Sequence, residues 1–211
     1  MCNDVIIRIA KGGEIQDFKK FLFKTYCLDL GWHDPAKFPK GIFTDEYDEV
    51  SVFLVVYSGH QLISGVRLVA DSEKGFPHEH VSMVSFTNMG NANIDPKIRN
   101  AVKTADRSKI MEITRCIAET KARRVYMNDL IKAMYWFGVS NSIEIYFMVA
   151  DVKTFLLCHK LGFPVMPVGI PFFCEGSWTI PAIMLVADMI PKNDIRQYFL
   201  DKSNLVGKWG K

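Results

Sequence analysis

The sequence predicts a mixed α/β fold in which helices flank one central sheet. Apolar residues recur with strand spacing and with helix spacing in the order strand, helix, hairpin, strand, helix, strand, helix, strand. Two of the predicted strands, VSVFLVVY at 50–57 and SIEIYFMVA at 142–150, are almost wholly apolar, which is typical of strands buried on both faces. No repeat or linker interrupts the 211 residues, so we expect one domain over 1–211 with a polar tail at about 203–211.

The composition argues against several classes of protein. Apolar residues make up 49% and charged residues 23% of the chain, and no apolar run approaches the roughly 20 residues of a membrane span. Asp4 and Arg8 interrupt the apolar run that a secretion signal near residue 1 would need, so we do not expect secretion. The five cysteines have no C-x-x-C spacing, which argues against disulfides and zinc, so we expect a cytoplasmic protein without a metal. The net charge of +3 does not require nucleic acid, but local basic clusters suit an acidic protein partner.

The N-terminal segment is predicted to form an edge strand and a helix. Residues 5–10 alternate weakly, and helical spacing begins at Glu14 and ends at Gly31. The apolar stripe of this helix contains Ile15, Phe18, Leu22 and Thr25 or Tyr26. The Pro-interrupted loop that follows brings Trp32 near the core, where packing is a commoner role for a tryptophan than contact with substrate.

An acidic run, TDEYDE at 44–49, precedes the first buried strand. Such runs are usually solvated turns. The hairpin partner, QLISGVRLV at 61–69, carries Arg67 on an otherwise apolar face. Because burying a guanidinium alone costs several kcal/mol, we expect Asp45 or Asp48 to pair with Arg67.

The segment from 71 to 109 is less periodic and contains one helix start. Asp95 and Pro96 suit the N-cap and the first helical position of a short basic helix that reaches about Arg107. His78 and His80 flank Glu79, but a histidine pair without a third ligand does not indicate a metal site.

The strand IMEITRCIA at 110–118 contains two charged residues, Glu112 and Arg115. Alternation places these two side chains on opposite faces unless the strand bulges. Charges in a core strand are costly unless they are paired, so they indicate a functional site or a buried ionic network.

The remaining elements complete the sheet and its helices. An amphipathic helix over 123–138 has its inward face at Met127, Leu130, Ile131, Met134 and Phe137. After the strand at 142–150, Asp151 caps a helix that stops at Gly162. A final strand near 180–187 contains Pro181, which predicts an edge or a bulge, and a short helix is predicted over 194–200.

Several short motifs together carry a resemblance to a known family. They are LGW at 30–32 with Tyr26 six residues before the Trp, D-x-x-D at Asp45 and Asp48, GVRLV around Arg67, E-x-T-R from Glu112 to Arg115, KLGF at 160–163 and VGIP at 168–171. Over roughly residues 15–172 the chain resembles the acyl-homoserine-lactone synthases and the long-chain N-acyl amino acid synthases. The resemblance implies a GNAT-type acyltransferase fold, in which two central parallel strands splay apart and admit a pantetheine arm.

The chain departs from the lactone synthases at informative positions. Their arginine four residues before the aromatic is matched by Leu22, although Lys24 is close by, and GFPHE at 75–79 looks like the N-acyl amino acid branch. AETKARR at 118–124 lacks the glycines of a pyrophosphate loop, and Cys158 replaces a tyrosine common in acetyl-CoA-using relatives. These departures favour an acyl donor carried by acyl carrier protein over free coenzyme A.

The resemblance therefore implies an N-acyltransferase that moves a long-chain fatty acyl group from acyl carrier protein to the amino group of an amino acid. Its donor is the acyl-phosphopantetheine of the carrier, and no tightly bound cofactor is expected. One alternative is an acyl-homoserine-lactone (autoinducer) synthase of quorum sensing that uses S-adenosylmethionine. A second is a non-catalytic sensor that binds acyl groups or carrier protein.

The resemblance also implies roles for individual residues. Glu112, as a half-buried carboxylate, takes the amine proton directly or through one water, backbone N–H groups beside a bulge hold the oxyanion, and Arg115 completes the catalytic pair. The expected substrate-binding residues are Trp32, Asp45, Asp48, Arg67, Ile113 and Thr114. For Arg115 and the charged members of that set a purely structural salt-bridge lattice is an equal alternative.

Two further surfaces are expected from the same resemblance. Carrier protein is acidic and is expected to dock on Arg99, Lys103, Lys121, Arg123, Arg124 and Lys153. An acyl tunnel is expected to be lined by residues such as Phe86, Met127, Met134, Phe147 and Met148.

Overall fold

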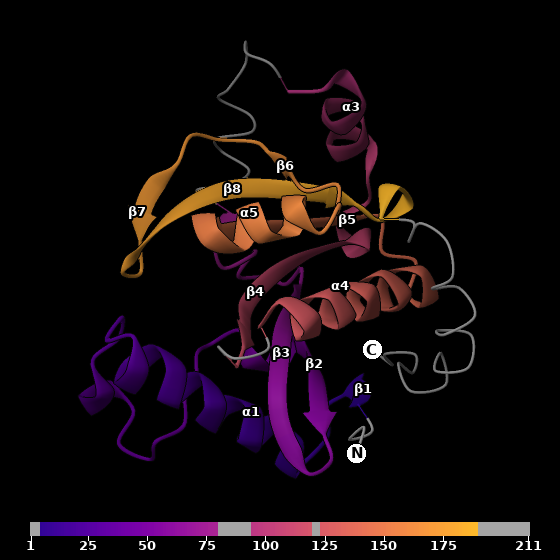
Figure 1. The fold of residues 1–211 in the computed structure, drawn as a ribbon. Helices are drawn as coiled ribbons and strands as arrows, with labels where there is room; N and C mark the ends of the chain where they lie inside the picture. The colour runs from indigo at the N-terminus through magenta and orange to yellow at the C-terminus, as the bar shows by residue number, and fades with distance from the viewer. Residues whose placement is uncertain (1–4, 80–93, 120–122, 190–211) are drawn as a thin grey trace.

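The computed structural model describes residues 5–79, 94–119 and 123–189, which form one eight-stranded sheet with helices on both faces. The strands lie in the order β1-β2-β3-β4-β5-β8-β6, and β7 pairs with β8 (Figure 1). They are β1 (Val5–Ile9), β2 (Ser51–Ser58), β3 (Gln61–Ala70), β4 (Ile110–Ala118), β5 (Ile145–Asp151), β6 (Met166–Pro167), β7 (Phe172–Cys174) and β8 (Ser177–Leu185). Only β4 and β5 pair in parallel. The predicted mixed α/β architecture is confirmed.

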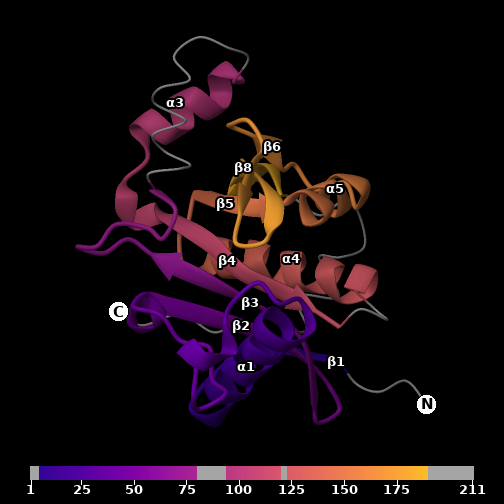
Figure 2. The same cartoon turned by 90° about the vertical axis from the view of Figure 1, so that its left-hand side faces the viewer.

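The helices are divided between the two faces of the sheet (Figure 2). They are α1 (Gly13–Phe23), α3 (Pro96–Thr104), α4 (Arg123–Ser140) and α5 (Val152–Lys160). The helices α4 and α5 pack on one face, whereas α1 and α3 pack on the other. Shorter helical turns are η1 (Lys24–Asp29, a π-helix), η2 (Pro35–Lys37), η3 (Asp48–Val50), η4 (Arg107–Lys109) and η6 (Val186–Asp188).

The two-sided coverage explains the unbroken apolar run of β2. Leu54 joins the core beneath α4, while its neighbours Phe53 and Val55 join the core beneath α1. Every one of these side chains is buried. The predicted inward stripe of α4 is confirmed as well, since Met127, Leu130, Ile131, Met134 and Phe137 are all buried.

The central feature of the sheet is the separation of β4 from β5. The two strands pair only from Ile110 opposite Ile145 to Ile113 opposite Met148. Beyond this point β4 continues to Ala118 and β5 to Asp151 with no further pairing between them. The splayed parallel strands expected for a GNAT-type fold are therefore present.

A bulge in β4 lies just past the point of separation. The register between β3 and β4 shifts between Gly65 and Arg67, which lie opposite Ile117 and Thr114. Arg115, inside this shift, has φ 53°, a left-handed conformation that is uncommon for any residue other than glycine. The sequence predicts that Glu112 and Arg115 lie on opposite faces unless the strand bulges. The structure contains this bulge.

Three sequence expectations need correction or lie outside the described residues. The strand that contains Pro181 is not an edge, because β8 pairs with β5 on one side and with β6 and β7 on the other. Proline is tolerated there because the pairing of β6 with β8 ends at Ala182, and the next contact, from the Val168 N–H to the Pro181 carbonyl at 2.9 Å, needs no N–H from Pro181. The helix from Pro96 ends at Thr104, earlier than expected. The helix predicted at 194–200 and the tail lie outside the described residues. Within the described part of the chain, no helix is long and apolar enough to cross a membrane.

Candidate functional site

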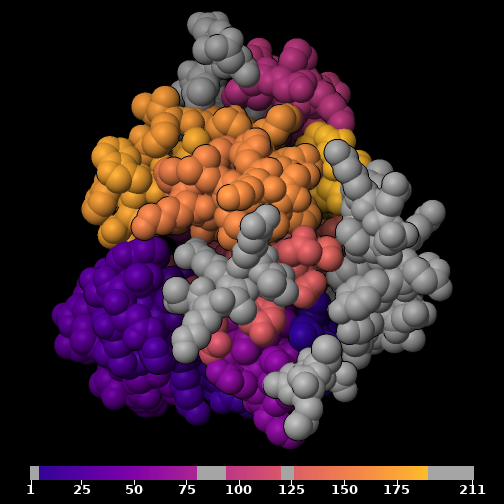
Figure 3. Space-filling model, in the orientation of Figure 1, coloured from indigo at the N-terminus to yellow at the C-terminus, as the bar shows by residue number. Residues whose placement is uncertain are grey.

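A cavity of about 840 Å³ lies where β4 and β5 separate. One wall is formed by β4 from Ile113 to Ala118 and another by β5 from Met148 to Asp151. Residues of η1, of the helices α4 and α5 and of the β7–β8 turn also line it. On the face shown in Figure 3, the N-terminal part of the chain (indigo) lies against the orange C-terminal part at the left of the view.

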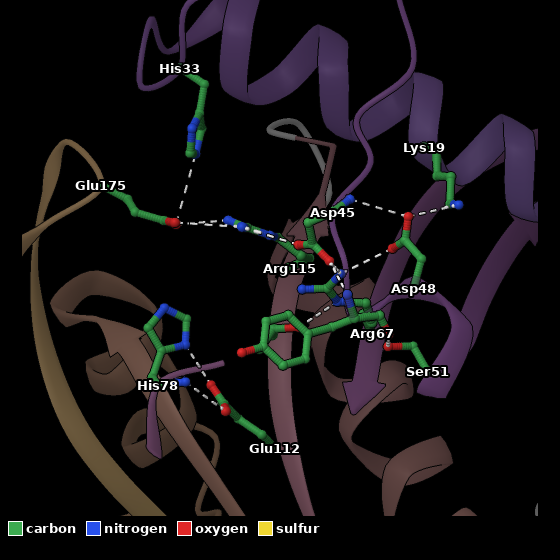
Figure 4. A network of polar contacts seen from close by, with 12 residues as sticks. Lys19, His33, Asp45, Asp48, Ser51, Arg67, His78, Glu112, Arg115 and Glu175 are labelled. Carbon is green, nitrogen blue, oxygen red and sulfur yellow. Dashed lines mark hydrogen bonds and ion pairs between the residues drawn. The ribbon is translucent and has the colours of Figure 1, made fainter. Parts of the chain in front are cut away.

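A buried ionic network supports the N-terminal side of this cavity (Figure 4). Arg67, 2% exposed, donates from one terminal nitrogen to Asp45 at 2.5 Å and to Asp48 at 3.0 Å. Its Nε donates to Thr114 Oγ1 at 2.8 Å. Lys19 adds a 2.8 Å ion pair to Asp48. The predicted pairing of Arg67 with the acidic segment is confirmed, and both aspartates take part.

The charges in this network explain the electrostatics of Asp45. Burial acts to raise the pKa of Asp45, but the hydrogen bond and charge of Arg67 together with the charge of Arg115 outweigh it. The pKa of Asp45 therefore lies below its ordinary value, and the carboxylate is ionised at neutral pH.

Arg115 connects this network to the opposite side of the cavity. Its terminal nitrogens lie 2.7 Å from Glu175 and 3.6 Å from Asp45, and its guanidinium lies 4.8 Å from the ring centre of Phe43. Burial acts to raise the pKa of Glu175, but the charge and hydrogen bond of Arg115 lower it further, so the net direction is down. The Arg115–Glu175 pair thus joins β4 to the turn between β7 and β8.

Two buried polar atoms in this region have no hydrogen-bond partner among the described residues: Arg115 Nε and His33 Nε2. Burial lowers the pKa of His33, so its ring is neutral at pH 7 and the 3.8 Å approach to Glu175 is not an ion pair there. Unsatisfied buried donors are rare in proteins. Arg115 also lines the cavity, although this Nε is itself buried from solvent.

Glu112 is held by a loop residue rather than by an arginine. Its side chain is fully buried, accepts the backbone N–H of His78 at 3.0 Å and lies 2.5 Å from the same residue's Nδ1. The expectation of a half-buried carboxylate is wrong, because His78 covers Glu112. His78 lines the cavity and Glu112 does not.

Aromatic side chains close the N-terminal end of the cavity. Tyr26, placed by the π-helix η1, stacks on Trp32 with ring centres 5.4 Å apart. Trp32 in turn packs against Gly176, where an added Cβ would lie 2.5 Å from the indole ring. Tyr26 and Trp32 both line the cavity, so Trp32 has a packing role and also forms part of the wall.

The structure separates the predicted site residues into groups. Trp32, Ile113, Thr114, Arg115 and Lys153 line the cavity. Asp45, Asp48 and Arg67 lie behind that wall and hold it through Thr114 and Arg115.

The residues predicted to dock carrier protein come from different elements of the chain. Arg99 and Lys103 lie on α3, which packs near the paired ends of β4 and β5 and contributes nothing to the cavity lining. Arg123 and Arg124 begin α4, five residues beyond the end of β4 at Ala118. Lys121 lies outside the described residues.

The predicted acyl tunnel is similarly divided. Met127, Met134 and Met148 line the cavity. Phe147 points to the opposite face, in the core with Phe76 and Ile98, because neighbouring strand residues face opposite ways. Phe86 lies outside the described residues.

Sequence reasoning missed four residues of this site: Lys19, His33, His78 and Glu175. His78 was considered as a metal ligand with His80 and as part of the GFPHE motif, but not as a residue of the site; His80 lies outside the described residues. The Glu175–Gly176 pair, with φ of 46° and 82°, is a recognisable hairpin turn. No local pattern shows that this turn meets β4.

Comparison with known proteins establishes the fold. No protein-family model and no curated protein matches the sequence. A CoA-dependent acyl-homoserine lactone synthase, BjaI, solved with SAM and isopentyl-CoA, is 17% identical, with a TM-score of 0.69 over 99% of this chain and 95% of that one. FeeM, an N-acyl amino acid synthase from uncultured soil microbes, is 10% identical, with a TM-score of 0.63 over 92% and 98%. An N-acetyltransferase from Lactobacillus plantarum is 11% identical, with a TM-score of 0.56 over 87% of this chain and 99% of that one.

The resemblance inferred from the dispersed motifs is confirmed at the level of the fold. This chain has the GNAT-like fold shared by these acyl-homoserine lactone, N-acyl amino acid and N-acetyl transferring proteins.

Proposed function

We propose that the protein is an N-acyltransferase that moves a long-chain fatty acyl group from acyl carrier protein to the amino group of an amino acid. The observation that carries this proposal is the cavity between the separated ends of β4 and β5. A pantetheine arm is a narrow, extended chain, and a gap between two strands offers it backbone groups on both sides. Charged residues for an amine substrate lie along the same cavity.

The geometry of β4 suits the chemistry of acyl transfer. An amine attacks the thioester carbonyl, and the resulting oxyanion needs hydrogen-bond donors that are already in place. Beyond Ile113 the edge of β4 that faces β5 is not paired with it, and the bulge at Arg115 redirects the backbone there. This stretch of β4 supplies the oxyanion donors in our proposal.

The charges around Arg115 suit an amino acid acceptor. The guanidinium of Arg115 is a charged donor for a carboxylate, while Glu175, which also lines the cavity, attracts an ammonium group. An α-amino acid carries both of these groups.

Different residues support the proposed binding of the acyl tail and of the carrier protein. Met127, Met134 and Met148 give the cavity an apolar region, and methionine adapts to flexible chains. Lys153, which is exposed and lines the cavity, is placed to meet an acidic carrier. The absence of glycine between residues 118 and 124 favours carrier-bound donor over free coenzyme A.

An acyl-homoserine-lactone synthase that uses S-adenosylmethionine is the second candidate. The likeness to BjaI favours it and also makes acyl-CoA a donor to be tested. Leu22, which replaces the arginine of the lactone synthases, is buried among Phe18 and Tyr26 and does not line the cavity, whereas Lys24 does.

One reaction mixture separates these candidates. Purified protein is incubated with long-chain acyl carrier protein, or with the matching acyl-CoA, and with a pool of amino acids plus S-adenosylmethionine, and products are identified by mass. We expect N-acyl amino acids from the carrier-bound donor, and their loss in Arg115→Ala but not in Lys11→Ala, an exposed lysine away from the cavity. Acyl-homoserine lactone as the product selects the second candidate. Carrier binding without any acylated amine refutes both and leaves a sensor.

A further inference from the structure

His78 lies between Glu112 and the cavity. Glu112 is fully buried and absent from the cavity lining, so its carboxylate does not reach a bound amine directly. The imidazole of His78 is 20% exposed and lines the cavity. Figure 4 shows the Nδ1 edge of the ring directed at Glu112 and the opposite edge directed away from it. A proton that leaves an amine in the cavity therefore meets His78 before Glu112.

The bonds to Glu112 determine which ring nitrogen carries hydrogen. An ionised carboxylate only accepts hydrogen bonds. One oxygen of Glu112 accepts the backbone N–H of His78, and the other lies 2.5 Å from Nδ1. With Glu112 as a carboxylate, Nδ1 donates this bond, and the lone pair of a neutral ring then lies on Nε2.

We propose that His78 is the catalytic base of the acyl transfer and that Glu112 is a positioning residue that orients its ring and sets its tautomer. This inference rests on the proposed function and changes the role that the sequence implied for Glu112. It also explains why a carboxylate on a core strand has a histidine for its partner. The same carboxylate stabilises the imidazolium that forms when Nε2 accepts a proton.

The proton balance of the step is complete within the two substrates and His78. An amine that binds as ammonium first gives one proton to solvent. The neutral amine then attacks the thioester carbon, a C–N bond forms, and His78 Nε2 takes the second amine proton. The tetrahedral intermediate expels the pantetheine sulfur, the C–S bond breaks, and His78 returns the proton to that sulfur. The products are an amide and a thiol, and no other reactant is required.

Two substitutions separate catalysis by His78 from a purely structural role. The amide nitrogen of His78→Asn donates to Glu112 as Nδ1 does but provides no base. In Glu112→Gln the amide oxygen accepts the His78 backbone N–H and the amide nitrogen donates to Nδ1, which moves the ring hydrogen to Nε2 and removes the base without removing the ring. Lys11→Ala is the control.

We expect kcat to fall about 10²–10⁴-fold in both variants, with the KM for each substrate within about 3-fold of wild type. A variant that combines His78→Asn with Glu112→Gln should be no slower than either single variant, because the two residues act as a unit. Exogenous imidazole should restore part of kcat in His78→Ala. In ¹⁵N NMR spectra, the wild-type His78 ring should carry its hydrogen on Nδ1, and the Glu112→Gln ring should carry it on Nε2. Urea unfolding confirms that each variant is folded.

The outcomes are distinguishable. If wild type acylates an amine and folded His78→Asn keeps a kcat within about 3-fold of it, His78 is not the base and the inference is wrong, while the proposed function stands. The same conclusion follows if His78→Ala is folded, slow and unaffected by imidazole. If wild type acylates no amine from either donor, the proposed function fails and this inference fails with it.

Discussion

Replacing Arg67 with methionine tests whether the buried network holds the N-terminal side of the cavity. Methionine keeps much of the apolar length of Arg67 but removes the 2.5 Å and 3.0 Å contacts to Asp45 and Asp48 and the bond to Thr114. Removing one partner of a buried ion pair costs about 3–5 kcal/mol because a charge is left uncompensated. Asp48 keeps Lys19 at 2.8 Å and Asp45 keeps Arg115 at 3.6 Å, so we expect the lower end, about 3 kcal/mol.

Urea unfolding followed by circular dichroism measures this cost. With a urea dependence of about 2–3 kcal/mol per M, the midpoint of Arg67→Met should fall by about 1–1.5 M. Arg8→Met, at a partly exposed pair with Glu14, should change stability by less than about 1 kcal/mol. Adding Asp45→Asn and Asp48→Asn to Arg67→Met should recover part of the loss, because the uncompensated charges are then gone. A loss below about 1 kcal/mol for Arg67→Met at an unchanged urea dependence would refute the reasoning.

Three other predictions concern pH, packing and docking. The pKa values of Asp45 and Glu175 are lowered in the folded state, so these groups stabilise it above their unfolded values near 4 and lose that contribution as pH falls through the folded values. Urea titrations at pH 7 and pH 3.5 should show the loss, and Asp45→Asn should make the difference smaller; an equal difference contradicts the assignment. Gly176→Ala should cost about 2–4 kcal/mol in urea unfolding, from positive φ and from the clash with Trp32, whereas Gly162→Ala, at a similar φ of 81° with no atom within 4 Å of its Cβ, should cost only about 1–2 kcal/mol; equal losses would show that the Trp32 side chain moves aside. Lys153→Glu should raise the KM for acyl carrier protein several-fold and weaken its salt dependence in a steady-state assay, while Lys11→Glu should not; similar effects from both would indicate only net charge.

Local pattern in the sequence was sufficient for much of the fold. The two-residue period of strands and the apolar stripe of α4 depend on which side chains avoid water, and that property is carried by each residue and its near neighbours. The pairing of Arg67 with the acidic segment was also predictable, because a guanidinium on a buried face needs a carboxylate and the nearest ones precede the same hairpin. Pro181 was assigned to an edge or a bulge because the sequence does not reveal β6, a strand of only two residues that pairs with β8.

The site could be predicted only in part. Alternation showed that Glu112 and Arg115 share a face only if β4 bulges, but no residue pattern indicated that Arg115 adopts φ 53°. The sequence places Lys103 and Lys153 equally well near a docking surface. The structure puts the first on α3, away from the cavity, and the second in its lining.

The sequence by itself determined the elements, their order and the charged residues that must find partners, since these follow from periodicity and from the cost of burying a charge. Only the tertiary structure decided that His78 covers Glu112, that Glu175 meets Arg115 and that β4 leaves β5 after Ile113. These contacts join residues 34 and 60 positions apart, or depend on where two strands stop pairing. Such contacts are set by the packing of the whole sheet against its helices, which no local window of sequence contains.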